Sequence, residues 1–231
     1  MRVCYDASEL EAILEQIRTV AATRFGNAGL FLERFLPEAR HVEVQVFGDG
    51  LGGVIVLGDR DCSLQRRNQK VVEECPAPNI PADVRELLHQ SSKDLASSVK
   101  YQSAGTVEFL YDPLSKRPYF LEVNTRLQVE HGVTEQVYGI DLVEWMIRLT
   151  QGTLPPVGEL EEATRQNGHS IQVRLYAEDP YKDFLPSPGE IRSSFSENGR
   201  VESWLSGQND ISHWFDPHLA NLIGSAGTRK E

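Results

Sequence analysis

The stretch from Tyr119 to Glu135 constrains the fold of this 231-residue chain most strongly. Its first half reads YFLEVNTR, and the alternation of apolar and polar side chains predicts a β-strand. The polar side chains then share one face, at a spacing of roughly 6.5 to 7 Å. They are Glu122, Asn124 and Arg126, followed by Gln128 and Glu130 if the chain stays extended. Such a row suits a hard cation together with an anion, and the alternative is a half-buried strand with a solvated charged face.

A second predicted strand lies upstream, where residues 104–112 read AGTVEFLYD. A hairpin would pair this strand with residues 118–124, so that Glu108 and Glu122 could meet across the sheet. Two adjacent carboxylates repel each other unless a cation neutralises them. Because Mg²⁺ prefers one or two carboxylates together with substrate phosphates, the hairpin predicts a magnesium site.

The composition predicts a soluble globular protein of one or two domains, with 40% hydrophobic and 25% charged residues and neither a membrane-length apolar run nor a signal peptide. A net charge of −11 argues against partners such as nucleic acid or an anionic membrane. The cysteines have no metal-like spacing, which predicts free thiols in a reducing compartment, the cytoplasm. They are Cys4, Cys62 and Cys75.

Local patterns place the remaining elements. Asp6 or Ser8 can cap an amphipathic helix over residues 6–26, which Gly26 ends. We also expect a strand at 29–36, a hairpin over 40–58, a helix over 81–101, a helix between Asp141 and Gly152, and a strand that begins at 169.

Several sequence motifs resemble those of a known family. GTVEFLYD followed by FLEVNTRLQVEHGVTE resembles the ATP-grasp core of biotin carboxylases, and LQVEH is highly specific within that family. The form QRRNQK at 65–70, with DLVEWMIR at 141–148, resembles the biotin carboxylase domain of urea carboxylase, including the fungal urea amidolyases. The resemblance implies an α+β fold, with part of an ATP-grasp lid and the large antiparallel-sheet domain followed by the start of a C-terminal subdomain.

The resemblance also implies domain boundaries. It assigns residues 1–36 to the lid subdomain, 37–152 to the ATP-grasp core, 153–168 to a linker and 169–231 to a partial C-terminal subdomain. By this comparison the chain lacks the glycine-rich phosphate loop and the N-terminal subdomain of the family. It also lacks a biotin attachment sequence, a carboxyltransferase segment and an amidase segment, so we expect a truncated member.

The resemblance implies roles for the central stretch. The expected ligands of Mg²⁺ or Mn²⁺ at the ATP phosphates are Glu108, Glu122 and Asn124. Bicarbonate would be held by Arg126, Gln128, the backbone of Val129 and Lys70. Glu130 would remove the bicarbonate proton, and Arg174 would stabilise the enolate-like ureido oxygen of biotin. The expected catalytic residues are therefore Arg126, Glu130 and Arg174.

Further positions are implied around the nucleotide. The expected adenine contacts are Glu33, Arg34, Phe35 and Leu36. His41 would contact ATP and Gln65 would line the site, while Glu43 is expected to pair with a basic residue because an unpaired buried carboxylate is costly. Asn68 is also among the expected cofactor-binding residues, but it replaces the histidine of most biotin carboxylases and cannot carry charge near neutral pH. Gly132 and Asn221 stand where the family commonly has proline and lysine.

The implied function is ATP-dependent carboxylation by bicarbonate of biotin carried on another domain. In a urea carboxylase the carboxyl group would finally reach urea and give allophanate, which requires biotin carboxyl carrier and carboxyltransferase domains as partners. The family also allows a homodimer. Two alternatives stay open: a non-catalytic truncated fragment, and a biotin carboxylase of the acetyl-, propionyl- or pyruvate-carboxylase type.

Overall fold

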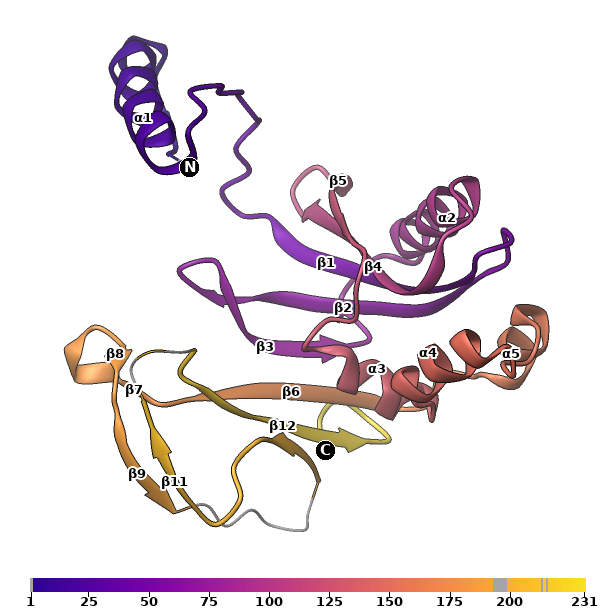
Figure 1. The fold of residues 1–231 in the computed structure, drawn as a ribbon. Coiled ribbons are helices and arrows are strands. Elements are labelled where there is room, and N and C mark those ends of the chain that lie inside the picture. The colour runs from indigo at the N-terminus through magenta and orange to yellow at the C-terminus, as the bar shows by residue number, and fades with distance from the viewer. Residues whose placement is uncertain (1, 193–198, 213, 215) are drawn as a thin grey trace. The chain divides into compact units, whose positions relative to one another are not determined.

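The computed structural model describes residues 2–192, 199–212, 214 and 216–231. The chain forms two compact units, residues 1–38 and residues 39–231. Figure 1 shows the elements of each unit along the chain. Among the described residues, none of the helices combines the length and the apolar character needed to cross a membrane.

The N-terminal unit contains the predicted helix, as the short 3-10 turn η1 (Ala7–Glu9) and the α-helix α1 (Leu10–Phe25). The Asp6 carboxylate caps it by accepting a hydrogen bond of 2.7 Å from the backbone N–H of Ser8. Gly26 ends it in the left-handed conformation, with φ of 66°. The strand predicted at 29–36 is wrong, because none of the described residues pairs with this segment, and an unpaired extended segment has no ladder.

The larger unit is built on an eight-stranded antiparallel sheet with the order β10-β12-β6-β3-β2-β1-β4-β5. Its strands are β1 (Arg40–Asp49), β2 (Val54–Arg66), β3 (Gln69–Cys75), β4 (Gln102–Asp112), β5 (Arg117–Asn124), β6 (His169–Tyr176), β10 (Arg200–Ser203) and β12 (His218–Ala226). The hairpins predicted over 40–58 and 104–124 are confirmed as β1–β2 and β4–β5. The predicted α+β class is confirmed as well.

Two small ribbons accompany the main sheet. One pairs β9 (Gly189–Arg192) with β11 (Gln208–Ile211), and the other pairs β7 (Glu178–Asp179) with β8 (Leu185–Pro186) around the 3-10 turn η2 (Pro180–Lys182). The ion pair between Arg66 and Glu178 ties the second ribbon to the end of β2.

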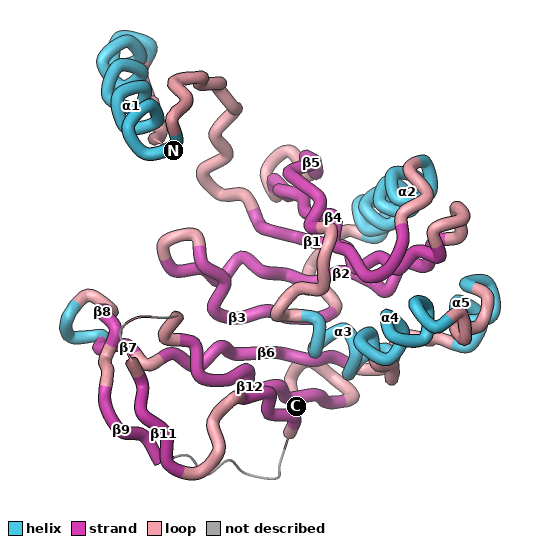
Figure 2. Tube along the Cα trace, viewed as in Figure 1, coloured by secondary structure: helices cyan, strands magenta, loops and turns pink. Residues whose placement is uncertain are grey.

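The described residues of the larger unit also form the α-helices α2 (Ala82–Ser98), α3 (His131–Tyr138), α4 (Leu142–Gln151) and α5 (Val157–Ala163), whose places along the trace Figure 2 shows. The predicted helices α2 and α4 are confirmed, and the Asp141 carboxylate caps α4 by accepting from the Glu144 N–H at 2.8 Å. α3 and α5 were not predicted. α5 lies within the expected linker 153–168, where Val157 and Leu160 are buried.

Strand β1 lies inside the sheet, between β2 and β4, and is buried on both faces. On one face Val42, Val44 and Val46 pack in the same apolar cluster as Val84 and Leu88 of α2. The opposite face carries buried polar side chains, because β-strand side chains alternate between faces. These are Glu43 and Gln45, which begin the candidate site.

Candidate active site

Lys70 on β3 lies at the centre of the polar face. Its Nζ contacts the carboxylates of Glu43 at 2.6 Å, Glu108 at 2.9 Å and Glu130 at 2.7 Å. Burial alone would lower the pKa of Lys70, but the three carboxylates outweigh burial and raise the pKa above its usual value. The ammonium group therefore stays charged, and it holds together three carboxylates that would otherwise repel each other.

Glu108 and Glu122 pair directly across β4 and β5, as the sequence predicted. Both carboxylates accept from the Asn124 amide, at 3.0 and 3.2 Å, so they converge on one small polar group. Burial favours the neutral form of Glu108, but His41 and Lys70 lower its pKa to about 2. Two converging carboxylates suit Mg²⁺. In this structure the NH₂ end of Asn124 faces them and the Asn124 oxygen accepts from Arg126, so the expected role of Asn124 as a metal ligand stays a prediction.

Arg60 on β2 is a fully buried member of the site that the sequence analysis missed. Its Nε donates to Glu43 at 2.6 Å, and its Nη1 donates to Gln45 at 2.7 Å and to Thr134 at 2.9 Å. Glu43 thus has the basic partner that was expected for it. The predicted hairpin ends at residue 58, whereas β2 continues to Arg66 and so places Arg60 opposite Glu43.

Glu130 does not continue the extended strand. β5 ends at Asn124, the chain then turns, and Glu130 is the residue before the first turn of α3. The reason is a local turn in which the His131 N–H donates to the Gln128 carbonyl at 3.2 Å. This turn brings the Glu130 carboxylate between two cations, Lys70 Nζ at 2.7 Å and Arg174 Nη2 at 2.9 Å.

Arg174 on β6 connects Glu130 to a second buried carboxylate, Glu73. Arg174 Nε donates to Glu73 at 2.7 Å, and Gln172 Nε2 donates to the other Glu73 oxygen at 3.1 Å. Burial raises the pKa of Glu73 to about 7, although Arg174 opposes this. Sequence reasoning missed Glu73 because its partner Arg174 is 101 positions away, and the β3–β6 pairing that joins them was not predicted.

The remaining polar residues predicted in the larger unit extend this cluster. Gln128 donates to Glu108 at 2.8 Å and accepts from Arg60 at 3.2 Å. Arg126 is exposed and donates to the Asn124 side-chain oxygen at 3.2 Å. Beside Lys70, His41 Nε2 lies 2.7 Å from Glu108. Gln65 Nε2 lies 3.0 Å from His41 Nδ1, and the Val129 side chain is partly exposed.

Asn68 lies at the tip of the hairpin formed by β2 and β3. β2 and β3 are joined by Arg67 and Asn68, with φ of 52° and 65°. Two left-handed residues form the favoured hairpin turn, and asparagine tolerates this conformation well. Asn68 is exposed, and its predicted site role stays a prediction, as do the adenine contacts of the N-terminal unit, Glu33, Arg34, Phe35 and Leu36.

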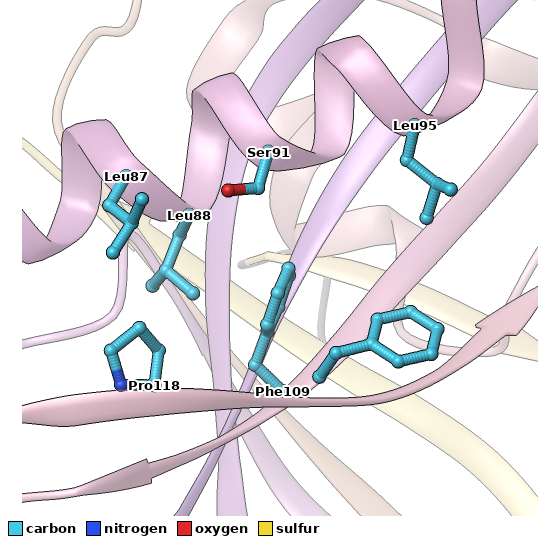
Figure 3. Close-up of a pocket in the computed structure, with 7 residues that line it drawn as sticks. Leu87, Leu88, Ser91, Leu95, Phe109 and Pro118 are labelled. Atoms are coloured by element: carbon cyan, nitrogen blue, oxygen red, sulfur yellow. The ribbon is translucent and has the colours of Figure 1, made fainter. Parts of the chain in front are cut away.

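An apolar pocket of about 400 Å³ lies apart from these charges, between α2 and the β4–β5 hairpin (Figure 3). It is lined by Leu87, Leu88, Ser91, Leu95, Phe109, Pro118 and Phe120. Since no charged side chain lines it, the pocket does not share the chemistry of the Lys70 cluster.

Comparison with known proteins assigns the chain to a family. Residues 1–156 match the family described as carbamoyl-phosphate synthase L chain, ATP binding domain. The chain belongs to this family. Residues 172–231 match the biotin carboxylase C-terminal domain. This ATP-binding domain followed by a biotin carboxylase domain confirms the resemblance stated from the sequence, including the ATP-grasp fold.

Urea amidolyase from Saccharomyces cerevisiae is 51% identical over 216 residues, which cover 93% of this chain and 12% of that protein. The crystal structure of Kluyveromyces lactis urea carboxylase has a TM-score of 0.80 and 45% identity, and covers 94% of this chain and 18% of its own. The biotin carboxylase domain of Hydrogenobacter thermophilus 2-oxoglutarate carboxylase has a TM-score of 0.87 and 40% identity, over 98% of this chain and 50% of its own. The chain spans at most half of each of these three relatives.

Proposed function

We propose that this chain carries the biotin carboxylase reaction of a urea carboxylase, in which ATP and bicarbonate carboxylate biotin. The observation that carries the proposal is the Glu130 carboxylate between Lys70 and Arg174, at 2.7 and 2.9 Å. Two fixed cations beside one carboxylate place positive charge next to a base. Bicarbonate needs cations that bind its negative charge and a base that accepts its proton.

In the proposed reaction a bicarbonate oxygen attacks the γ-phosphorus of ATP, Glu130 accepts the bicarbonate proton, and ADP leaves. Lys70, Arg126 and Gln128, with the Val129 backbone, would hold bicarbonate during this step. The product, carboxyphosphate, would break down to CO₂ and inorganic phosphate. The phosphate would take the proton from the ureido nitrogen of biotin, and this nitrogen would form the new bond to CO₂. Arg174 would stabilise the negative charge that develops on the ureido oxygen of biotin.

Glu108, Glu122 and Asn124 would hold the divalent cation, Mg²⁺ or Mn²⁺, at the phosphates. A bound cation would offset the negative charge of ATP that otherwise repels bicarbonate. The relative from H. thermophilus supports a magnesium-bound nucleotide and bicarbonate as ligands, since its structure is described as a biotin carboxylase domain dimer with MgADP and bicarbonate. The same description supports, for this chain, a homodimer.

Urea is proposed as the final acceptor, giving allophanate, because the S. cerevisiae and K. lactis relatives are a urea amidolyase and a urea carboxylase. Biotin would be supplied by a carrier domain, and a carboxyltransferase domain would complete the transfer to urea. Since both relatives are several times longer than this chain, such domains are consistent with their length. The cytoplasm stays the expected compartment.

The proposal is tested by bicarbonate-dependent ATP cleavage with Mg²⁺ and free biotin. The assay uses the 231-residue chain and, in parallel, any longer natural chain that contains it. We expect Arg126→Ala to lower the rate about 100-fold or more, by analogy with removal of one charge-stabilising group. The matched control is Arg165→Ala, an exposed arginine that donates to the backbone carbonyls of Glu161 and Thr164.

Cleavage that does not require bicarbonate, or that survives in Arg126→Ala, would overturn the proposal. Absence of cleavage from every natural chain that contains this sequence would favour the non-catalytic alternative. Cleavage together with failure to carboxylate urea in the longer chain would favour another acceptor.

A further inference from the structure

Asn221 on β12 is a buried amide that links three parts of the fold. Its Nδ2 donates to the Val129 carbonyl and to the Glu202 carboxylate, both at 3.3 Å. Its Oδ1 lies 2.9 Å from the Nε2 of His218. The two acceptors on one side and the imidazole on the other fix the orientation of the amide, because only the NH₂ end can serve two acceptors.

Asn221 also lies directly opposite Arg174 in the ladder between β12 and β6. Directly opposed side chains of an antiparallel pair lie on the same face of the sheet. Arg174 holds the Glu130 carboxylate at 2.9 Å, while Asn221 holds the carbonyl of the preceding residue, Val129. One cross-strand pair therefore contacts both the side chain of Glu130 and the peptide that leads into it.

The contact with the Val129 carbonyl matters because Glu130 lies within the turn at 128–131 and directly precedes α3. The Val129 carbonyl belongs to the peptide unit that includes the Glu130 N–H, so fixing this oxygen fixes the plane of that peptide. Without the Asn221 donor, the Val129 carbonyl would lose this hydrogen bond, and the Val129–Glu130 peptide would be free to rotate.

We propose, on the basis of the function proposed above, that Asn221 is a positioning residue that orients the Val129–Glu130 peptide and thereby aims the Glu130 carboxylate. It acts through the backbone and does not touch the reacting atoms. A packing role is the competing explanation, since Asn221 is only 5% exposed.

Two substitutions separate these explanations. Asn221→Leu keeps similar volume and removes the donor, whereas Asn221→Lys is larger and supplies a donor for the Val129 carbonyl and the Glu202 carboxylate. Both lose the acceptor for His218, and they differ in the donor and in the positive charge that lysine adds beside Glu202. A packing role predicts that leucine is tolerated better than lysine, and a positioning role predicts the reverse. Asn221→Ser, too short to reach Val129, replaces the leucine variant if that variant does not fold.

The first measurement is amide hydrogen exchange of the segment 127–133, which does not depend on activity. We expect exchange about three- to tenfold faster in Asn221→Leu, the usual effect of one lost hydrogen bond, and a rate near that of the wild type in Asn221→Lys. The matched control is Asn209→Leu on β11, whose amide donates to Gly207 at 3.4 Å. Unchanged exchange in Asn221→Leu, or faster exchange in Asn221→Lys than in Asn221→Leu, would overturn the proposal.

The second measurement is bicarbonate-dependent ATP cleavage in whichever chain is active. We expect kcat to fall about three- to tenfold in Asn221→Leu and to recover in Asn221→Lys, while KM for ATP stays unchanged. A fall in Asn221→Leu that lysine does not restore would contradict the positioning role. If the wild type shows no cleavage, the proposed function fails, and the exchange experiment still decides whether Asn221 orders the turn.

Discussion

Glu73 offers the sharpest test of the electrostatics of the site. It is fully buried, accepts from Arg174 at 2.7 Å and from Gln172 at 3.1 Å, and lies near other carboxylates. Burial raises its pKa from 4.5 to about 7, Arg174 acts in the opposite direction, and the charges of Glu130 and Glu43 add to the rise. The folded protein therefore binds a proton at Glu73 at pH values where the unfolded chain has released it.

The sign of the stability effect follows from this difference. Between pH 4.5 and about 7 the unfolded chain is ionised at Glu73 while the folded protein is still protonated there. The free energy of unfolding must therefore fall as the pH rises through this range. The full effect is about 3 kcal/mol at 1.36 kcal/mol per pKa unit, and about 2.5 kcal/mol of it develops between pH 5 and pH 8.

Glu73→Gln removes this titration and keeps the shape of the side chain. The new amide oxygen can still accept from Arg174, and Gln172 Oε1, which is buried and has no partner among the described residues, can accept from the new amide nitrogen after the Gln172 amide rotates. Urea unfolding at pH 5 and pH 8 measures the effect. We expect wild type to lose about 2.5 kcal/mol more than the variant on going from pH 5 to pH 8.

Glu161→Gln serves as the matched control, because Glu161 on α5 is exposed and pairs with Lys93 at 2.7 Å. This control should follow the wild type at both pH values. An equal change in wild type and Glu73→Gln would refute the reasoning, since Glu73 would then ionise alike in the folded and unfolded states.

Two further substitutions test packing and charge pairing. Gly132→Ala would place its Cβ 2.4 Å from Ile223 Cδ1, so we expect a loss of about 1 to 3 kcal/mol in urea unfolding. Ile223→Val removes that methyl group and should restore most of the loss in the double variant; no restoration would mean that the contact is not the cause. Arg60→Leu would remove one of the two cations that contact the buried Glu43 carboxylate at 2.6 Å, and we expect a loss of about 3 to 5 kcal/mol. A urea midpoint equal to that of the exposed control Arg165→Leu would contradict this.

Gly132 stands where the family commonly has proline, and it illustrates what reasoning from neighbouring residues misses. A glycine after LQVEH suggests only a more permissive backbone. In the structure Gly132 lies inside α3, and its lack of a side chain lets Ile223 of β12 approach. The reason for glycine is thus a contact with a residue 91 positions away, which no local pattern contains.

The sequence by itself determined the β1–β2 and β4–β5 hairpins, the facing pair Glu108 and Glu122, and the helix caps at Asp6 and Asp141. These features depend on residues close in the chain, where side-chain alternation, turn residues and capping groups act over a few positions. The family followed from contiguous strings for the same reason.

Only the tertiary structure decided which distant residues meet around Lys70 and Glu130. The contacts of Glu130 with Arg174, of Arg174 with Glu73, and of Asn221 with Val129 join segments 44 to 101 positions apart. They exist because β6 and β12 pair beside β3 in one sheet and because the chain turns at 128–131 instead of continuing as a strand. Strand order and chain reversal are set by the burial of the whole sheet, and no single stretch of sequence encodes them.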